Sequence, residues 1–221
     1  MIHNASLIHD DIIDNSDFRR GIKSLSSEFG NKLGVICGDY LLSLAMEEIL
    51  NLDCNYITKN IVKTLKQMCL GEINQNFDRF KIGTIEEYIE KIKQKTAYLF
   101  ETALECCAFI SNKDYNIEKI KYFGQNFGIA FQIKDDLLNI LKNEDLKPVQ
   151  SDIAQGIYTA PVIFAGNIEN LEIGVEKTKD LLNNYIKNLL YQLKDIDNNI
   201  YKKALEELVE LLKIRKNLSA K

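Results

Sequence analysis

The chain of 221 residues carries 28 Lys and Arg against 32 Asp and Glu, a net charge of -4. That balance argues against a general nucleic-acid-binding protein, which normally shows a basic excess. Two Pro and 11 Gly, where average usage would give roughly 11 Pro and 15 Gly, predict long helices joined by short loops.

Helical periodicity extends over most of the sequence, and Asn- and Asp-rich stretches mark the turns between helices. No alternating run is long enough to indicate a sheet, and residues 142–151 are the most loop-like stretch. We therefore expect an all-α protein, a single-domain helical bundle over residues 1–221 around a central cavity. The expected helices are 1–14, 31–52, 55–78, 85–111, 116–142, 152–167, 171–194 and 197–217.

The five Cys are odd in number and form no CxxC pair, which argues against structural zinc and a disulfide framework. The best apolar run, residues 33–46, is interrupted by Asp39 and is too short for a membrane span. No basic and apolar leader is recognisable. These features predict a soluble protein of the cytoplasm with free thiols, without a transmembrane segment and without nucleic acid as a partner.

The first expected helix carries an acidic cluster. Asp10 and Asp14 are four positions apart and share one helix face, with Asp11 on its flank. Like charges at this spacing destabilise a helix, so a compensating partner is expected. Mg²⁺ is suitable, because it binds one or two carboxylates together with phosphate oxygens. The following Arg19 and Arg20 can bind phosphate oxygens bidentately.

A second cluster repeats this spacing in the expected helix 116–142. Asp135, Asp136 and Asn139 occupy positions i, i+1 and i+4, after an apolar segment that contains Phe131 and Gln132. One such cluster alone could be a solvated acidic patch. Two clusters, one of them followed by paired arginines, indicate a magnesium-dependent site for a diphosphate.

Together with further ordered motifs, these clusters make the sequence resemble the trans-isoprenyl diphosphate synthase (polyprenyl synthetase) family over about residues 1–161. The motifs are Asp10 to Gly21, Gly38-Asp39, Gly71-Glu72-Ile73-Asn74-Gln75, Lys95-Thr96-Ala97, Phe131-Gln132 with Asp135-Asp136, Lys147-Pro148, Asp152, and Thr159-Ala160-Pro161.

The resemblance implies condensation of an allylic diphosphate with isopentenyl diphosphate, usually by a homodimer. It implies that magnesium, held by Asp10, Asp14 and Asp135 and adjoined by Asp136 and Asn139, assists departure of the allylic diphosphate. Isopentenyl diphosphate then attacks the cation, and loss of a proton restores an alkene. The resemblance places Arg19, Lys95 and Lys147 at the allylic diphosphate, Arg20 at isopentenyl diphosphate, and Thr96 and Gln132 near the cation.

Several of these residues have plainer interpretations. Lys95 also fits a solvated helix face, and Gln132 also fits a buried amide bonded to the backbone. Glu72 and Gln75 equally fit helix packing. His3 and His9 are six positions apart, a poor spacing for one metal, and structural roles are expected for both.

Product length depends, in the family, on the residue five before the first Asp. Here it is Ala5, followed by Ser6, and both are expected to leave the product tunnel open. A medium- or long-chain polyprenyl diphosphate is therefore predicted.

The sequence also departs from the family. Asn139 replaces an Asp and carries no charge, so a third magnesium ion is expected to bind less tightly, and Ile157 stands where a Lys is frequent. The family's opening helices and Gly-Gly-Lys-x-Arg segment do not occur in this chain. We therefore expect an N-terminally truncated form with weak or no condensation activity alone. A non-catalytic subunit of a heteromeric synthase and a terpene cyclase-like enzyme are the alternative hypotheses.

Overall fold

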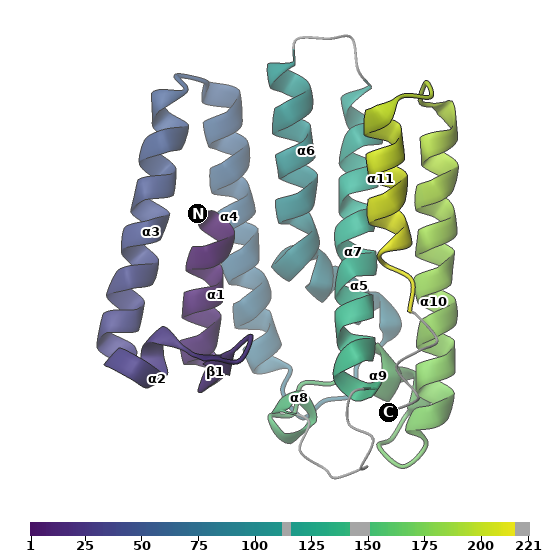
Figure 1. Ribbon diagram of the computed structural model, residues 1–221. Coiled ribbons are helices and arrows are strands. Elements are labelled where there is room, and N and C mark those ends of the chain that lie inside the picture. The colour runs from purple at the N-terminus through teal and green to yellow at the C-terminus, as the bar shows by residue number, and fades with distance from the viewer. Residues whose placement is uncertain (112–115, 142–150, 215–221) are drawn as a thin grey trace. The chain divides into compact units, whose positions relative to one another are not determined.

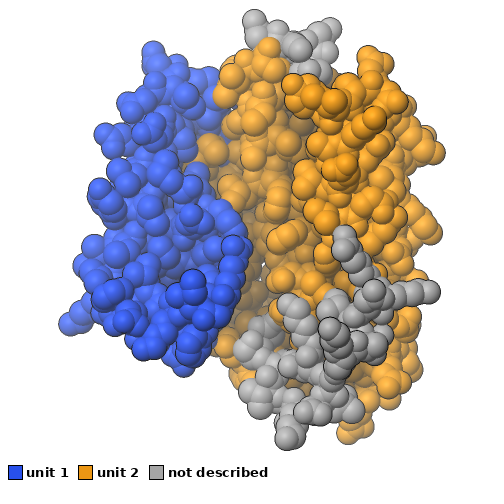
Figure 2. Space-filling view, in the orientation of Figure 1, with its two compact units in different colours: residues 1–60 blue, residues 61–221 orange. Residues whose placement is uncertain are grey.

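The computed structural model describes residues 1–111, 116–141 and 151–214, and the side chains of residues 151 and 152 are not among those described. The chain divides into two compact units, residues 1–60 and 61–221 (Figure 2). Helices dominate both units, which confirms the expected all-α fold (Figure 1). Among the described residues, no helix is both long and apolar enough to cross a membrane.

The first unit is built around the helix that carries the first acidic cluster. It contains α1 (Ile2–Ile13), β1 (Phe18–Arg19), β2 (Ile22–Lys23), α2 (Leu25–Phe29), α3 (Asn31–Asn51) and the start of α4 (Asn55–Phe77). Helix α1 packs against α3, which comes close because Gly34 and Gly38 have no side chains: a Cβ at Gly34 would lie 2.9 Å from Ile12 Cδ1. The small hairpin β1–β2 and helix α2 were not expected from the sequence.

The second unit contains the rest of α4 and the remaining helices around one apolar core. They are α5 (Ile85–Ile92), a π-helical turn η1 (Lys93–Ala97), α6 (Tyr98–Ile110), α7 (Ile117–Leu141), α8 (Ser151–Ala154), α9 (Ala160–Ala165), α10 (Leu171–Gln192), the 3₁₀ turn η2 (Leu193–Asp195) and α11 (Ile200–Glu210). Helix α7 is central to this unit, since it contacts α6, η1, α9 and α10. Its side chains Ile133 and Leu137 are fully buried.

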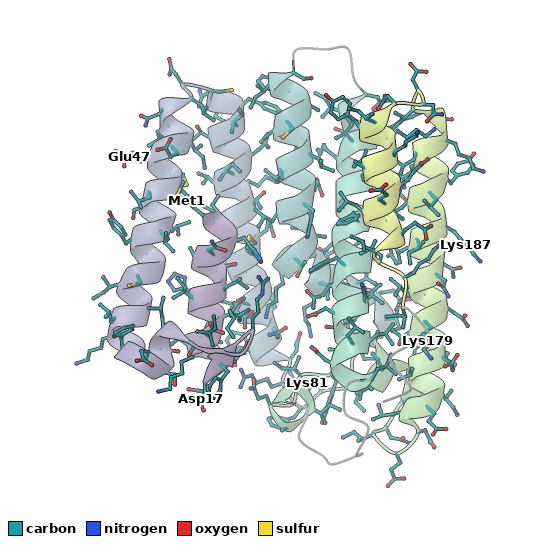
Figure 3. All side chains as sticks on the ribbon, in the orientation of Figure 1. Met1, Asp17, Glu47, Lys81, Lys179 and Lys187 are labelled. Carbon is teal, nitrogen blue, oxygen red and sulfur yellow. The ribbon has the colours of Figure 1, made fainter. Side chains whose placement is uncertain are left out.

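Helix α10 shows how the apolar periodicity selects the buried face. Leu182, Ile186 and Leu189 are buried in the core that α7 shares. Lys187, on another face of α10, is exposed and points outward (Figure 3). The side chains therefore follow the amphipathic pattern that predicted this helix.

Two expected helices are interrupted. The predicted helix 85–111 contains the π turn Lys93–Ala97, although the chain remains helical throughout. The predicted helix 152–167 is wrong as a single element, because α8 ends at Ala154 and α9 begins at Ala160. Gly156 between them adopts φ +75°, which a right-handed helix does not allow, and its carbonyl accepts a hydrogen bond of 2.8 Å from the Phe80 N–H.

Candidate functional site

The first acidic cluster lies on the last turns of α1, in the first unit. Asp10 and Asp14 are half-buried and share one helix face, whereas Asp11 is buried with 5% of its surface exposed. Asp11 accepts hydrogen bonds from Arg19 Nε at 2.8 and 2.9 Å, one to each carboxylate oxygen. Arg19 Nη2 lies 2.7 Å from Asp11 Oδ1. Asp11 is therefore the acid of this cluster that binds the hairpin, whereas Asp10 and Asp14 lie half-buried on the neighbouring face of α1.

The two predicted arginines occupy different positions of the β1–β2 hairpin. Arg19 pairs with Ile22 in the ladder, and Arg20 and Gly21 form the turn with φ of 53° and 80°. Two successive positive φ values are typical of a type I′ turn, which matches the twist of paired strands. Arg19 is consequently directed to Asp11, while Arg20 is exposed at the hairpin tip. Hydrogen bonding to Asp11 raises the pKa of Arg19.

His3 is on the same face of α1 as Asp10, because seven residues make nearly two full helical turns. Partial burial lowers its pKa, and the charges of Arg20 and Arg19 lower it further. The hairpin therefore places a positive field along this face.

His9 packs against α3 instead. Its ring lies over Gly38, where a Cβ would come within 2.3 Å of Nε2, and Nε2 is 3.2 Å from Asp39 Oδ1. This geometry is that of the structural role expected for His9.

Ala5 and Ser6 lie on different faces of α1. Ala5 is 2% exposed and shares a face with Ile12, which packs at Gly34 of α3. Ser6 is one turn before Asp10 and on the same face, with its hydroxyl donating to the His3 carbonyl at 2.8 Å. Ala5 therefore lies on the face of α1 that packs against α3, and Ser6 lies on the face of Asp10.

The second acidic cluster lies on α7, in the second unit, and divides in the same way. Asp135 and Asn139 are exposed, whereas Asp136 is buried with 5% exposed. Asp136 accepts one hydrogen bond from Tyr88 OH at 2.6 Å and one from Gln132 Nε2 at 2.9 Å. Both oxygens of this predicted metal residue are therefore engaged by protein donors.

Gln132 also joins α7 to the π turn. Its Oε1 accepts a hydrogen bond from Thr96 Oγ1 at 2.8 Å, so the two residues expected near the cation do meet. The contact depends on Gly128, one turn earlier on α7. A Cβ at Gly128 would lie 2.5 Å from the Cα of Ala97, which is fully buried. Gly128 thus permits the close approach that brings Gln132 to Thr96.

Lys95 in the π turn forms an ion pair with Glu72 of α4. Lys95 Nζ lies 2.7 Å from Glu72 Oε2, and Gln75 Nε2 donates to Glu72 Oε1 at 3.3 Å. A glycine also allows α4 and the π turn to approach each other here, since a Cβ at Gly71 would lie 2.9 Å from Gln94 Cβ. Lys95 is about 29% exposed at its side chain, so it is neither fully solvated nor enclosed.

Two residues that shape the surroundings of Asp136 and Gln132 were not identified from the sequence. Tyr88 is 3% exposed, and its hydroxyl reaches Asp136 across 48 positions of the chain. Burial, followed by the charge of Asp136, raises the pKa of Tyr88 well above 10.0. Gly128 is the other. The predicted residues Lys147 and Pro148 lie outside the described residues, as does the side chain of Asp152.

Magnesium was expected at these acids. In the described residues, no group of three or more His, Cys, Asp and Glu gathers as a metal-binding cluster. The oxygen donors at these motifs are the half-buried pair Asp10 and Asp14 on α1 and, on α7, the exposed Asp135 and Asn139. That donor set fits Mg²⁺, which keeps open positions for phosphate and water rather than needing an all-protein cage.

Comparisons with known proteins show the family of this chain. The family model described as "Polyprenyl synthetase" matches residues 1–203. A prenyl transferase of Cyanophora paradoxa is 41% identical over 169 residues, which cover 75% of this chain and 52% of that protein. Component 2 of the heptaprenyl diphosphate synthase of Bacillus subtilis is 33% identical over 217 residues, 96% of this chain and 57% of that protein.

Solved structures show the same fold. The crystal structure of heptaprenyl diphosphate synthase from Staphylococcus aureus has a TM-score of 0.87 and 28% identity, and the match covers 96% of this chain and 76% of that one. The chain spans a little over half the length of the curated relatives that it matches. On the match over residues 1–203, supported by these similarities, this chain belongs to the polyprenyl synthetase family.

Proposed function

We propose that the chain acts in a magnesium-dependent trans-prenyltransferase, which condenses an allylic diphosphate with isopentenyl diphosphate to form a medium- or long-chain polyprenyl diphosphate. The observation that carries the proposal is the shared division of the two acidic clusters. In each, the second Asp is buried and binds protein donors, whereas the first and fifth positions of the motif are less buried: Asp10 and Asp14 are half-buried, and Asp135 and Asn139 are exposed. Family membership supplies the reaction class.

Carboxylate oxygens of Asp10, Asp14 and Asp135, with the amide oxygen of Asn139, would hold magnesium. When bound, magnesium would neutralise the charge that develops on the departing diphosphate. Lys95 and Arg19 would bind the allylic diphosphate, as would Lys147, and Arg20 at the exposed hairpin tip would bind isopentenyl diphosphate. Thr96 and Gln132 would place oxygen dipoles near the allylic cation.

The first experiment separates binding and ionisation from condensation. The purified chain is incubated with farnesyl diphosphate, with and without Mg²⁺, and binding and pyrophosphate release are measured. Radiolabelled isopentenyl diphosphate is then added and the products are extracted and sized. We expect magnesium-dependent binding and pyrophosphate release; with isopentenyl diphosphate we expect weak or no condensation, and any product should be longer than farnesyl diphosphate. Absence of magnesium-dependent binding would overturn the proposal.

A variant pair checks that the acids of these motifs are responsible. Asp10→Asn should lower magnesium-dependent affinity about tenfold or more, because it removes a charged ligand oxygen. Glu47→Gln, on the exposed surface of α3, changes the charge of the same unit by the same amount and should leave binding unchanged. Equal effects of the two variants would point to a general charge effect.

A homodimer is part of the proposal, and α3 provides a surface for a second copy. Leu33, Ile36 and Tyr40 are exposed and form one stripe at helical spacing. Analytical ultracentrifugation should give twice the 25.4 kDa mass of one chain, and the Tyr40→Glu variant should sediment as a monomer. The cytoplasmic location stays a prediction.

A heteromeric synthase is the second candidate. One relative that covers 96% of this chain is named as component 2 of a synthase, a name that implies another component. Under this hypothesis the chain works with a different subunit. It predicts that the chain alone stays monomeric with slow turnover, and that co-expression with a second subunit restores both association and product formation.

A further inference from the structure

Four side chains of the second unit form a continuous hydrogen-bonded series that ends in the apolar core. Tyr88 OH lies 2.6 Å from Asp136 Oδ2, and Gln132 Nε2 lies 2.9 Å from Asp136 Oδ1. Gln132 Oε1 in turn lies 2.8 Å from Thr96 Oγ1. The series joins α5, α7 and the π turn η1.

The chemistry of Asp136 fixes the direction of every bond in this series. An ionised carboxylate only accepts hydrogen bonds, so Gln132 must present its NH₂ group to Asp136. The amide oxygen then faces Thr96, and the Thr96 hydroxyl must donate its hydrogen to that oxygen. The lone pairs of Thr96 Oγ1 are therefore directed away from Gln132, in the orientation that stabilises a nearby cation.

Tyr88 secures Asp136 from the core side. Its ring is 3% exposed and packs in the core with Ile92 and Ala97, so the phenol has little freedom to turn away. The bond is short and has a charged acceptor, which makes it stronger than a neutral hydrogen bond. Asp136 itself is 5% exposed, so water cannot readily replace the phenol.

We propose that Tyr88 is a positioning residue, which acts through Asp136 to orient Gln132 and Thr96 at the site of the allylic cation. The inference rests on the proposed function for the identity of the cation, but the orientation of Gln132 is a property of the chain alone. Tyr88 is buried and donates its hydroxyl hydrogen to Asp136, and Asp136 acts as the acceptor that holds two donors.

Two variants are decisive. Tyr88→Phe keeps the aromatic ring and removes the hydroxyl donor. Asp136→Asn keeps the shape of the side chain and allows the Gln132 amide group to flip. Tyr122→Phe is the matched control, because it removes an exposed hydroxyl of the same unit, which accepts a hydrogen bond of 3.5 Å from the Asn188 amide. All three chains are first compared with the wild type by circular dichroism.

The first readout needs no substrate. The ¹⁵N-labelled side-chain amide of Gln132 is assigned by its loss in Gln132→Leu, and its exchange with water is measured by NMR. We expect exchange about tenfold faster in Tyr88→Phe and in Asp136→Asn, because the buried acceptor that holds the amide is disturbed. Tyr122→Phe should match the wild type. An unchanged Gln132 amide in Tyr88→Phe would overturn the proposal.

The second readout separates binding from turnover. With Mg²⁺ and a non-ionisable thiolo analogue of farnesyl diphosphate, Tyr88→Phe should bind within about twofold of the wild type, while kcat for pyrophosphate release falls about 10- to 100-fold. A fall in affinity as large as that in kcat would instead make Asp136 part of the metal site and contradict the proposal. If Tyr88→Phe does not fold, the amide exchange of Asp136→Asn decides the question.

The two hypotheses fail in different ways. If the wild-type chain releases no pyrophosphate, the proposed function fails for this chain, and amide exchange still tests the role of Tyr88. If pyrophosphate is released but Tyr88→Phe behaves like Tyr122→Phe in both readouts, the proposed function stands and the positioning role is wrong.

Discussion

Arg19 and Asp11 form a bidentate contact in which Arg19 Nε donates to both oxygens of the carboxylate, at 2.8 and 2.9 Å. Arg19 Nη2 adds a third close approach, 2.7 Å from Asp11 Oδ1. One edge of the Arg19 guanidinium therefore binds Asp11, and this contact links the β1–β2 hairpin to α1, the helix of the first acidic cluster. Arg19 is a structural residue as well as a candidate for phosphate binding.

The first prediction concerns the substitution Arg19→Lys, which keeps the positive charge but replaces the planar guanidinium group by an ammonium group. We expect a loss of about 1–2 kcal/mol in the free energy of unfolding, because the buried Asp11 loses one of its charge-assisted bonds. Urea unfolding measures it. Arg20→Lys is the control at the exposed hairpin tip and should change stability by less than about 0.5 kcal/mol. Equal losses for both would show that the Asp11 contact contributes nothing specific.

The second prediction uses His3, whose pKa is lowered by partial burial and by the charges of Arg20 and Arg19. A folded-state pKa below the ordinary value of 6.5 means that the folded state binds fewer protons. The contribution of His3 to stability is therefore present above pH 6.5 and is lost as the pH falls through the lower, folded-state pKa. His3→Gln should flatten this part of the pH profile of stability.

The same residue should report a bound anion. The chain has two His, so NMR titration can follow the His3 imidazole individually. Pyrophosphate without metal should raise the pKa of His3, because the anion offsets the positive field of the hairpin. Arg20→Ala should raise it as well and should reduce the further change that pyrophosphate causes. A His3 pKa that responds to neither would contradict the placement of the arginines near this face.

Sequence alone predicted most of the helices within two residues at each end, because their apolar periodicity is strong. It missed the break at Gly156, since the backbone bond from Phe80 that accompanies the break is a contact between distant segments. The π turn was also unpredictable, because Lys, Gln, Thr and Ala at positions 93–97 are compatible with an α-helix. The hairpin strands are too short to give an alternating pattern.

The candidate site could be located from sequence but not divided into roles. The spacing of Asp10 and Asp14 fixes their common face, whereas the binding of Asp11 to Arg19 depends on the hairpin turn. Likewise, nothing local to Asp136 indicates that its partner is Tyr88, 48 positions away. Periodicity describes a single element, so it cannot show which of two adjacent acids becomes buried by contact with another.

The third prediction concerns Gly128→Ala, where the new Cβ would lie 2.5 Å from Ala97 Cα. Backbone must move, so we expect a loss of about 1–3 kcal/mol in the free energy of unfolding and a weaker bond between Thr96 and Gln132. The control is Gly124→Ala, one turn earlier, whose Cβ would lie 2.9 Å from Glu101 Cα. Both should destabilise, but only Gly128→Ala should shift the Gln132 amide signal in NMR.

The fourth prediction tests the ion pair between Lys95 and Glu72, whose charged atoms are 2.7 Å apart. Lys95→Ala should lower the affinity for an allylic diphosphate about tenfold, because a charge-assisted phosphate contact is lost. Glu72→Gln should raise it about two- to fivefold, since the neutral amide competes less with the diphosphate for the ammonium. Calorimetric titration measures both. A lower affinity in Glu72→Gln would mean that Glu72 orients Lys95 for binding.

The fifth prediction separates Ala5 from Ser6 in the control of product length. Ala5 is buried and points toward α3, so a bulky side chain there must displace that helix. Ala5→Phe is therefore expected to cost about 1–3 kcal/mol in the free energy of unfolding. Ser6 is half-buried and lies one turn before Asp10 on the acidic face, where a growing chain attached to a bound diphosphate would extend.

Ser6→Phe should consequently shorten the longest product while leaving stability nearly unchanged, and Ala5→Phe should affect stability first. Product sizing by reversed-phase chromatography and urea unfolding of both variants provide the comparison, with Ser6→Ala as the control that removes only the bond to the His3 carbonyl. A shorter product from Ala5→Phe at unchanged stability would place the growing chain between α1 and α3. The orientation of two adjacent residues on one helix thus distinguishes two routes for the product.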